Sequence, residues 1–68
     1  MTQQEKTKSA EKVSNWGSFN VMKLTEGDSQ QYAVVEWRDG TVHLLTEHLS
    51  WAEDRAQILH YRHDVYGV

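Results

Sequence analysis

The chain contains no cysteine, and this absence excludes two of the usual ways of stabilising a small domain. Disulfide bonds are ruled out, and so is every zinc site that depends on thiolates. With 68 residues the chain forms one small domain. A domain of this size buries only about 60% of the surface of its unfolded chain. Self-association is therefore the expected source of additional burial.

Long apolar segments are also missing. The N-terminus lacks the apolar core of a secretory signal, and no run approaches the length that spans a bilayer. The lack of cysteine is typical of a reducing compartment. We therefore expect a cytoplasmic protein with no membrane partner. The short length, the lack of cysteine and the start at Met1 favour a bacterial or phage source.

Positive charge is scarce as well. The net charge is −3, with +1 on residues 1–14 and −4 on the rest of the chain. A protein that binds nucleic acid needs basic residues to neutralise phosphates, so this balance disfavours that class of partner. The negative charge is in turn too dilute for a mimic of DNA.

Motifs of known catalytic classes are absent. The sequence has no cysteine nucleophile, no Gly-rich phosphate loop, no G-x-S-x-G turn and no H-E-x-x-H pair. Serine, histidine and aspartate all occur, but their spacing does not predict that they meet at one site in the fold. A domain this small also has little mass with which to enclose a dry pocket. We expect neither enzymatic activity nor a cofactor.

The clearest positive signal is a β-hairpin over residues 31–45. Two β-prone runs flank Asp39 and Gly40, a pair typical of a two-residue turn. A further β segment is predicted at 18–25, where the apolar face switches at Met22 and indicates a bulge. A loop at 25–30 connects it to the hairpin.

A C-terminal helix is predicted from about 50 to 64. Ser50 and Glu53 have the spacing of a capping box, and Gly67 is suited to end the helix. Residues 1–14 are too polar to offset the entropy of ordering, so they are predicted to form a flexible tail. The remaining residues, 15–68, are predicted to form a single α+β domain. Its fold is a three-stranded antiparallel meander with the helix packed on one face.

The two-residue turn fixes the register of the hairpin, and the register sorts its side chains between two faces. A three-residue loop with a bulge would spoil the apolar face, so the two-residue turn is preferred. The face expected to receive the helix carries Trp37, Val35, Ala33, Val42, Leu44 and Thr46. The opposite, mixed face carries Arg38, Thr41, Glu36, His43, Val34 and Leu45. In this register Glu36 lies opposite His43, either as a modest surface ion pair or as a pH-responsive contact.

A protein partner, with the chain itself as a homodimer, is the function predicted from these surfaces. Apolar anchors with charged rims have the usual anatomy of a protein interface. The Trp51, Ile58 and Val65 stripe of the helix either wraps the edge of the core or faces a second molecule. The predicted partner-binding residues are Tyr32, Val34, Glu36, Arg38, His43 and Leu45 on the mixed face, and Trp51, Ile58, Arg62 and Val65 on the helix.

Two alternatives from other classes remain open. A sheet with a helix on its back resembles, in architecture only, the sheet-face DNA-binding modules of some integrases and plant transcription factors. Arg38 and Lys23, with Tyr32 and Trp16 as aromatic stacking residues, would then face nucleic acid, offset by Glu36 and Glu47. In the other alternative, His60 and His63 bind a metal ion, with His43 or His48 as a third ligand.

Overall fold

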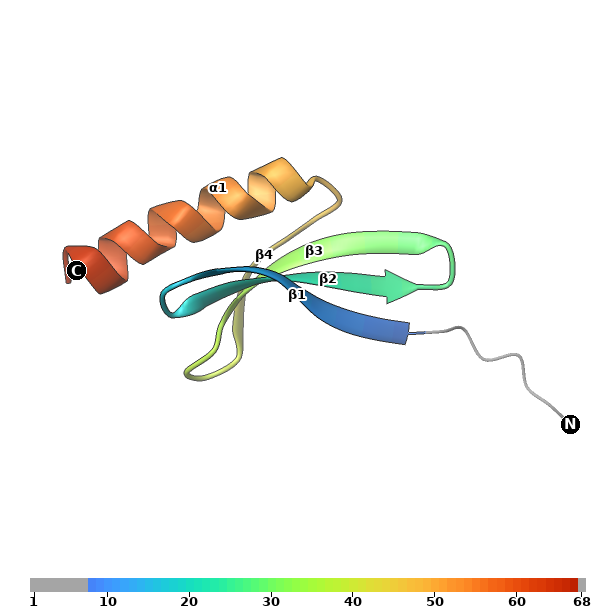
Figure 1. Cartoon of the computed structure of the whole chain (residues 1–68), viewed down its shortest axis with the longest axis horizontal. Helices are drawn as coiled ribbons and strands as arrows, with labels where there is room; N and C mark the ends of the chain where they lie inside the picture. The colour runs from blue at the N-terminus through green and yellow to red at the C-terminus, as the bar shows by residue number, and fades with distance from the viewer. Residues whose placement is uncertain (1–7, 68) are drawn as a thin grey trace, which may run out of the picture.

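The computed structural model describes residues 8–67, apart from the side chain of Lys8, and shows four antiparallel strands followed by one long helix (Figure 1). The strands are β1 (Lys8–Trp16), β2 (Phe19–Glu26), β3 (Ser29–Glu36) and β4 (Thr41–Thr46). They form one sheet in the order β1-β2-β3-β4. The helix consists of α1 (Leu49–Leu59) and a π-helical continuation, η1 (His60–Val65). The predicted α+β meander with a C-terminal helix is confirmed, with one strand more than expected.

Strand β1 is the element that the sequence did not predict. It begins at Lys8, inside the range 1–14 that composition assigned to a flexible tail. Residues 1–7 of that range lie outside the described residues. The backbone of β1 pairs with β2 from Lys8 opposite Glu26 to Trp16 opposite Phe19. Backbone hydrogen bonds to a neighbouring strand do not require apolar side chains, so a polar segment is ordered here.

The β2–β3 hairpin turns at Gly27 and Asp28, within the predicted loop. Its pairing runs without a shift from Glu26 opposite Ser29 to Phe19 opposite Glu36. A register shift does occur beside Met22, but its extra residue is Val13 in β1 and not a residue of β2 as predicted. The apolar face predicted for this segment switches at Met22 because β2 carries apolar side chains on both sides of the sheet. This arrangement leaves apolar side chains on the face that the helix does not cover.

The β3–β4 connection differs from the predicted two-residue turn. The Gly40 amide donates to the Glu36 carbonyl at 2.8 Å, which closes a turn over Trp37–Gly40. The Trp37 amide donates to the Ser18 carbonyl at 3.0 Å, which extends the contact of β3 with β2 by one residue beyond the pair of Glu36 and Phe19. Among these turn residues a positive φ occurs at Gly40 alone, whereas the predicted turn type requires it at Asp39 as well.

The register of β3 against β4 is consequently not the predicted one. Val35 lies opposite Val42 and Val34 opposite Leu44, which leaves His43 as an extra residue in a bulge. Because side chains alternate along a strand, Val34 shares the face covered by the helix with Leu44, and Val35 shares the opposite face with Val42. Val34 is fully buried, which corrects its prediction as a partner-binding residue.

The core lies between the helix and one face of the sheet. Its side chains are those of Phe19, Val21, Val34, Ala52, Ala56 and Leu59, with Trp16, Tyr32 and Leu44 packed against them. Trp37 and Val42, which were expected in the core, are 63% and 56% exposed. The helix contributes two alanines and one leucine to the core, so it buries little apolar surface there.

The helix begins without the predicted capping box. Its N-cap residue is His48, and no side chain caps the helix. Glu53 is directed toward β1 instead, where it accepts hydrogen bonds described below. At the other end Gly67 follows the C-cap residue with a φ of +75°, as expected for a glycine that ends a helix.

Candidate functional site

A cluster of four polar side chains joins the helix to both turns at one end of the sheet. Asp64 of η1 accepts hydrogen bonds from the Ser18 amide at 2.8 Å and the Ser18 hydroxyl at 2.7 Å. His60 Nδ1 lies 2.9 Å from the same carboxylate, and Arg38 Nη2 lies 3.4 Å from it. Arg38 also donates to the Ser18 hydroxyl at 3.0 Å. We call Ser18, Arg38, His60 and Asp64 the Asp64 cluster.

The helix approaches the β1–β2 turn so closely that a side chain at position 17 would have to displace side chains of the helix. Gly17 has a φ of +62°, and a Cβ on it would overlap His60 and the Asp64 carboxylate. The hydrogen bond from the Tyr66 amide to the Tyr61 carbonyl, 2.9 Å long, spans the five residues of a π turn. This wider turn belongs to the segment that places Asp64 against the sheet.

The Asp64 carboxylate is held in its charged form. The Ser18 amide, followed by the His60 ring and the Ser18 hydroxyl, lowers the pKa of Asp64 well below its ordinary value of 3.8. Hydrogen bonds to a carboxylate favour the ionised state, which accepts them more strongly. The cluster thus stabilises the attachment of the helix at ordinary pH.

Serine, histidine and aspartate meet in this cluster, but their order is not that of a catalytic triad. In a triad the imidazole lies between the hydroxyl and the carboxylate, so that it takes the hydroxyl proton. Here Asp64 lies in the middle and accepts from both Ser18 and His60. A carboxylate whose pKa is lowered is a weak base, so this geometry supports a structural role rather than activation of Ser18.

A second carboxylate ties the helix to β1. Glu53 accepts hydrogen bonds from the Trp16 indole nitrogen at 3.0 Å and from the Ser14 hydroxyl. Both partners lie in the strand that the sequence did not predict. These bonds explain why Glu53 does not turn back to cap its own helix.

The face of the sheet turned away from the helix is apolar at its centre. We call its apolar residues the uncovered sheet face: Met22, Leu24, Ala33, Val35, Val42 and Leu45. Val42 and Leu45 are more than half exposed. Charged side chains on this side of residues 9–67 lie at its margins, with Lys12 on β1 and Glu26 beside the β2–β3 turn.

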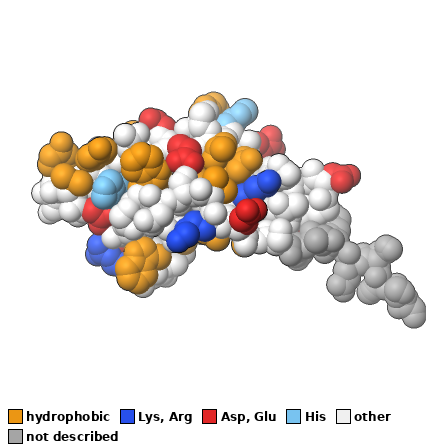
Figure 2. Space-filling view, viewed as in Figure 1, with side chains coloured by type: hydrophobic (Ala, Val, Ile, Leu, Met, Phe, Trp, Pro, Cys, Tyr) orange, Lys and Arg blue, Asp and Glu red, His pale blue; other side chains and the backbone are white. Residues whose placement is uncertain are grey.

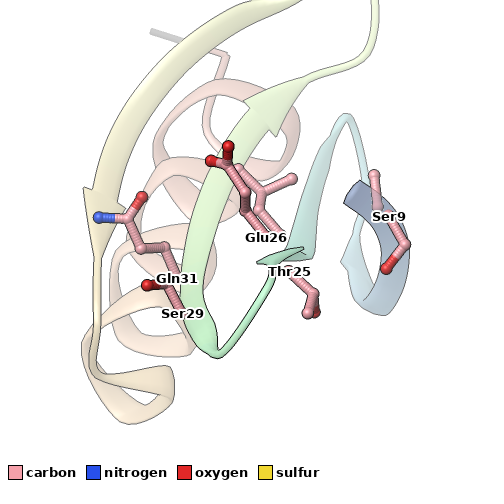
Figure 3. A pocket seen from close by; sticks show the side chains of 7 residues that line it. Ser9, Thr25, Glu26, Ser29 and Gln31 are labelled. Carbon is pink, nitrogen blue, oxygen red and sulfur yellow. The ribbon is translucent and has the colours of Figure 1, made fainter. Parts of the chain in front are cut away.

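An open hollow of about 470 Å³ lies near the β2–β3 turn (Figure 3). Leu24 and Ala10 contribute apolar surface, and the side chains around them are mostly hydroxyls and an amide. Glu26 is the single ionisable group in its lining. It is best described as an extension of the uncovered sheet face.

The side of the helix opposite the core carries a second exposed set, the outer helix face: Trp51, Arg55, Ile58, Arg62 and Val65. Trp51 is 60% exposed and packs against the His48 ring with 4.3 Å between centroids. Ile58 and Val65 are exposed as well. Figure 2 shows apolar and charged side chains interspersed over one face of the molecule. The larger apolar residues of the helix therefore face solvent.

The structure separates the predicted partner-binding residues into five groups. Val34 and Tyr32 belong to the core, Arg38 is bound in the Asp64 cluster, and Leu45 lies on the uncovered sheet face. The predicted contact between Glu36 and His43 is present at 3.1 Å. It forms through the bulge rather than by direct pairing, and the His43 ring also packs against Phe19. Trp51, Ile58, Arg62 and Val65 are all exposed on the helix, where the sequence placed them.

The four histidines are not gathered at one site, although the rings of His43 and His63 both pack against Phe19. His60 binds Asp64, His63 packs against Phe19, and His48 packs against Trp51. Within residues 8–67 no three His, Asp or Glu side chains are grouped to hold a metal ion. The described helices are also too short or too polar to cross a membrane.

Comparison with known proteins gives no relative for this chain. No family model matches it, and neither a curated protein nor a solved structure is significantly similar. The functional argument therefore depends on the surfaces of the molecule itself.

The close approach at Gly17 predicts unequal effects for two glycine substitutions. Gly17 and Gly40 both have positive φ, but a Cβ on Gly40 meets open space. We expect Gly40→Ala to reduce the free energy of unfolding by about 1–2 kcal/mol, the cost of a left-handed alanine. Gly17→Ala should reduce the free energy of unfolding by distinctly more, because the added Cβ also displaces the side chains of His60 and Asp64. Urea denaturation followed by tryptophan fluorescence measures both, and equal losses would contradict the described contact.

The lowered pKa of Asp64 predicts a pH dependence of stability. A carboxylate whose pKa is lower in the folded state stabilises the protein above the unfolded value near 3.8, and this contribution is lost as the pH falls below it. In Asp64→Asn we expect stability to fall less steeply with acidification than in the wild type. Asp54→Asn, on the exposed side of the same helix, is the matched control and should keep the wild-type slope. Thermal unfolding between neutral and acid pH gives both slopes, and identical slopes for all three proteins would refute the role of Asp64.

Proposed function

We propose that the protein is a non-enzymatic, cytosolic protein-interaction module of bacterial or phage type that acts as a homodimer. The observation that supports this proposal is the uncovered sheet face. Antiparallel sheets often have one solvated face, and that face then carries polar side chains. Here it carries Val42 and Leu45, 56% and 52% exposed, beside Met22 and Val35. Contiguous apolar surface of this kind marks an interaction site.

The small core gives a physical reason for association. Seven hydrophobic side chains are buried within the described residues, and three of them are alanines. Burial of a large aliphatic side chain contributes about 1.5–3 kcal/mol, whereas alanine contributes much less. A second copy that covers the uncovered sheet face adds larger aliphatic groups to the buried set.

The distribution of charge favours a second copy on this face. In a two-fold symmetric interface the same patch lies on both sides, so any charge at its centre meets a like charge. The centre of the uncovered sheet face has none, and Lys12 and Glu26 lie at its edges. Apolar self-contact is therefore free of electrostatic repulsion.

The dimensions of the sheet are compatible with such a dimer. Four strands about 4.8 Å apart, with a mean length of about eight residues at about 3.3 Å per residue, give a face of roughly 19 by 26 Å. Its flat area is therefore roughly 500 Å², and side-chain relief increases the accessible area. Stable interfaces bury about 800 Å² per partner, so we expect a dimer near the lower end of that range.

Two valines with nearly equal exposure provide the test. Val42 lies on the uncovered sheet face and is 56% exposed, and Val65 lies on the helix and is 54% exposed. We expect the wild type to dimerise in sedimentation equilibrium at high micromolar concentration. Val42→Glu should be monomeric, because it buries a carboxylate at the interface, whereas Val65→Glu should remain dimeric.

Circular dichroism confirms in the same samples that each variant is folded. A wild type that stays monomeric, or a dimer that is lost with Val65→Glu and kept with Val42→Glu, would contradict the proposal.

A further inference from the structure

The outer helix face has features that the proposed dimer does not use. Ala52, Ala56 and Leu59 turn toward the sheet and are buried, while Trp51 and Ile58 lie on the other side of the helix and remain exposed. On a helix that covers a sheet, the outward side ordinarily carries polar residues. Two faces of one helix are thus apolar, and the outward one has the larger side chains.

Two arginines accompany these apolar residues. Arg55 and Arg62 lie four residues after Trp51 and Ile58 respectively, a spacing that places each pair side by side on a helix. Neither guanidinium has a hydrogen-bond or ion-pair partner within residues 8–67, in contrast to Arg38 in the Asp64 cluster. Asp54 lies on the opposite flank of the Trp51 and Ile58 line. The face therefore combines an apolar centre with one cationic flank.

We propose that the outer helix face docks an acidic amphipathic helix of another protein. The apolar side of such a helix covers Trp51 and Ile58, and its Asp or Glu residues meet Arg55 and Arg62. A helix of this kind recognises a partner through anchors spaced three, four and seven residues apart. Arginine forms two parallel hydrogen bonds to a carboxylate, which fixes the register of the bound helix.

Charge complementarity favours this occupant over a second copy of the chain. Two outer helix faces packed antiparallel about Ile58 would bring Arg55 of one copy near Arg62 of the other. Like charges at an interface reduce affinity. The cationic flank therefore disfavours a second copy and favours a partner that carries negative charge. The charge-poor sheet face suits self-association, whereas the cationic flank of the helix suits an acidic partner.

A pair of synthetic peptides with opposite charge tests this proposal. Each has about 18 residues, roughly five helical turns, with leucine along one side. The flanking positions carry glutamate in one peptide and lysine in the other. We expect the full-length protein to bind the glutamate peptide, measured by fluorescence anisotropy, and to bind it less tightly as salt is added.

Matched substitutions then locate the site. Arg55→Glu with Arg62→Glu should weaken the glutamate peptide by about tenfold or more and should gain binding of the lysine peptide. Lys12→Glu, which changes a cation on the far side of the sheet, should leave both affinities unchanged. Val42→Glu should also bind the glutamate peptide normally, so the docking proposal can hold or fail independently of the dimer.

Several outcomes would overturn the proposal. Equal affinity for the two peptides, or no binding of the glutamate peptide at saturating concentration, would refute the proposal of an acidic partner. Binding to anionic lipid vesicles or to duplex DNA that requires Arg55 and Arg62, in place of the peptide, assigns this face to a different class of partner. Loss of dimerisation in the double arginine variant assigns it to self-association.

Discussion

The attachment of Asp64 to the β1–β2 turn is the interaction on which the arrangement of the domain depends. It joins the C-terminal end of the helix to Ser18, and through Arg38 it also reaches the β3–β4 turn. Gly17 leaves just enough room for this contact. The position of the helix determines which face of the sheet is covered, so the exposed apolar surface on the other face follows from the same contact.

The sequence predicted the local elements well and their assembly less well. The two hairpins and the helix follow from turn residues and periodicity, which act over short distances. The register of β3 against β4 was missed because the turn closes from the Gly40 amide to the Glu36 carbonyl and not as a two-residue turn at Asp39 and Gly40. The bulge at His43 then changed which side chains face the helix.

The same limitation applies to β1 and to the Asp64 cluster. Composition correctly describes β1 as polar, but its order comes from pairing with β2 and from Glu53, which binds Trp16 and Ser14. A glycine and a serine between Trp16 and Phe19 are a turn signal, and they indicate a strand on the N-terminal side. No spacing rule relates Ser18 to Asp64, whereas Trp51, Ile58, Arg62 and Val65 were found because helical periodicity alone defines them.

Two apolar surfaces with different charge are the basis of the two roles that we propose for the domain, self-association through the sheet and binding of an acidic helix through α1. Isotope-filtered NMR on a mixture of labelled and unlabelled protein tests the central claim, that the uncovered sheet face joins two copies. The account predicts nuclear Overhauser effects between copies at the methyl groups of Val42 and Leu45, and effects only within one chain from Val34 to Ala52 and Ala56. Intermolecular effects at Val34, or their absence from Val42 and Leu45 in a sample that is dimeric, would contradict it.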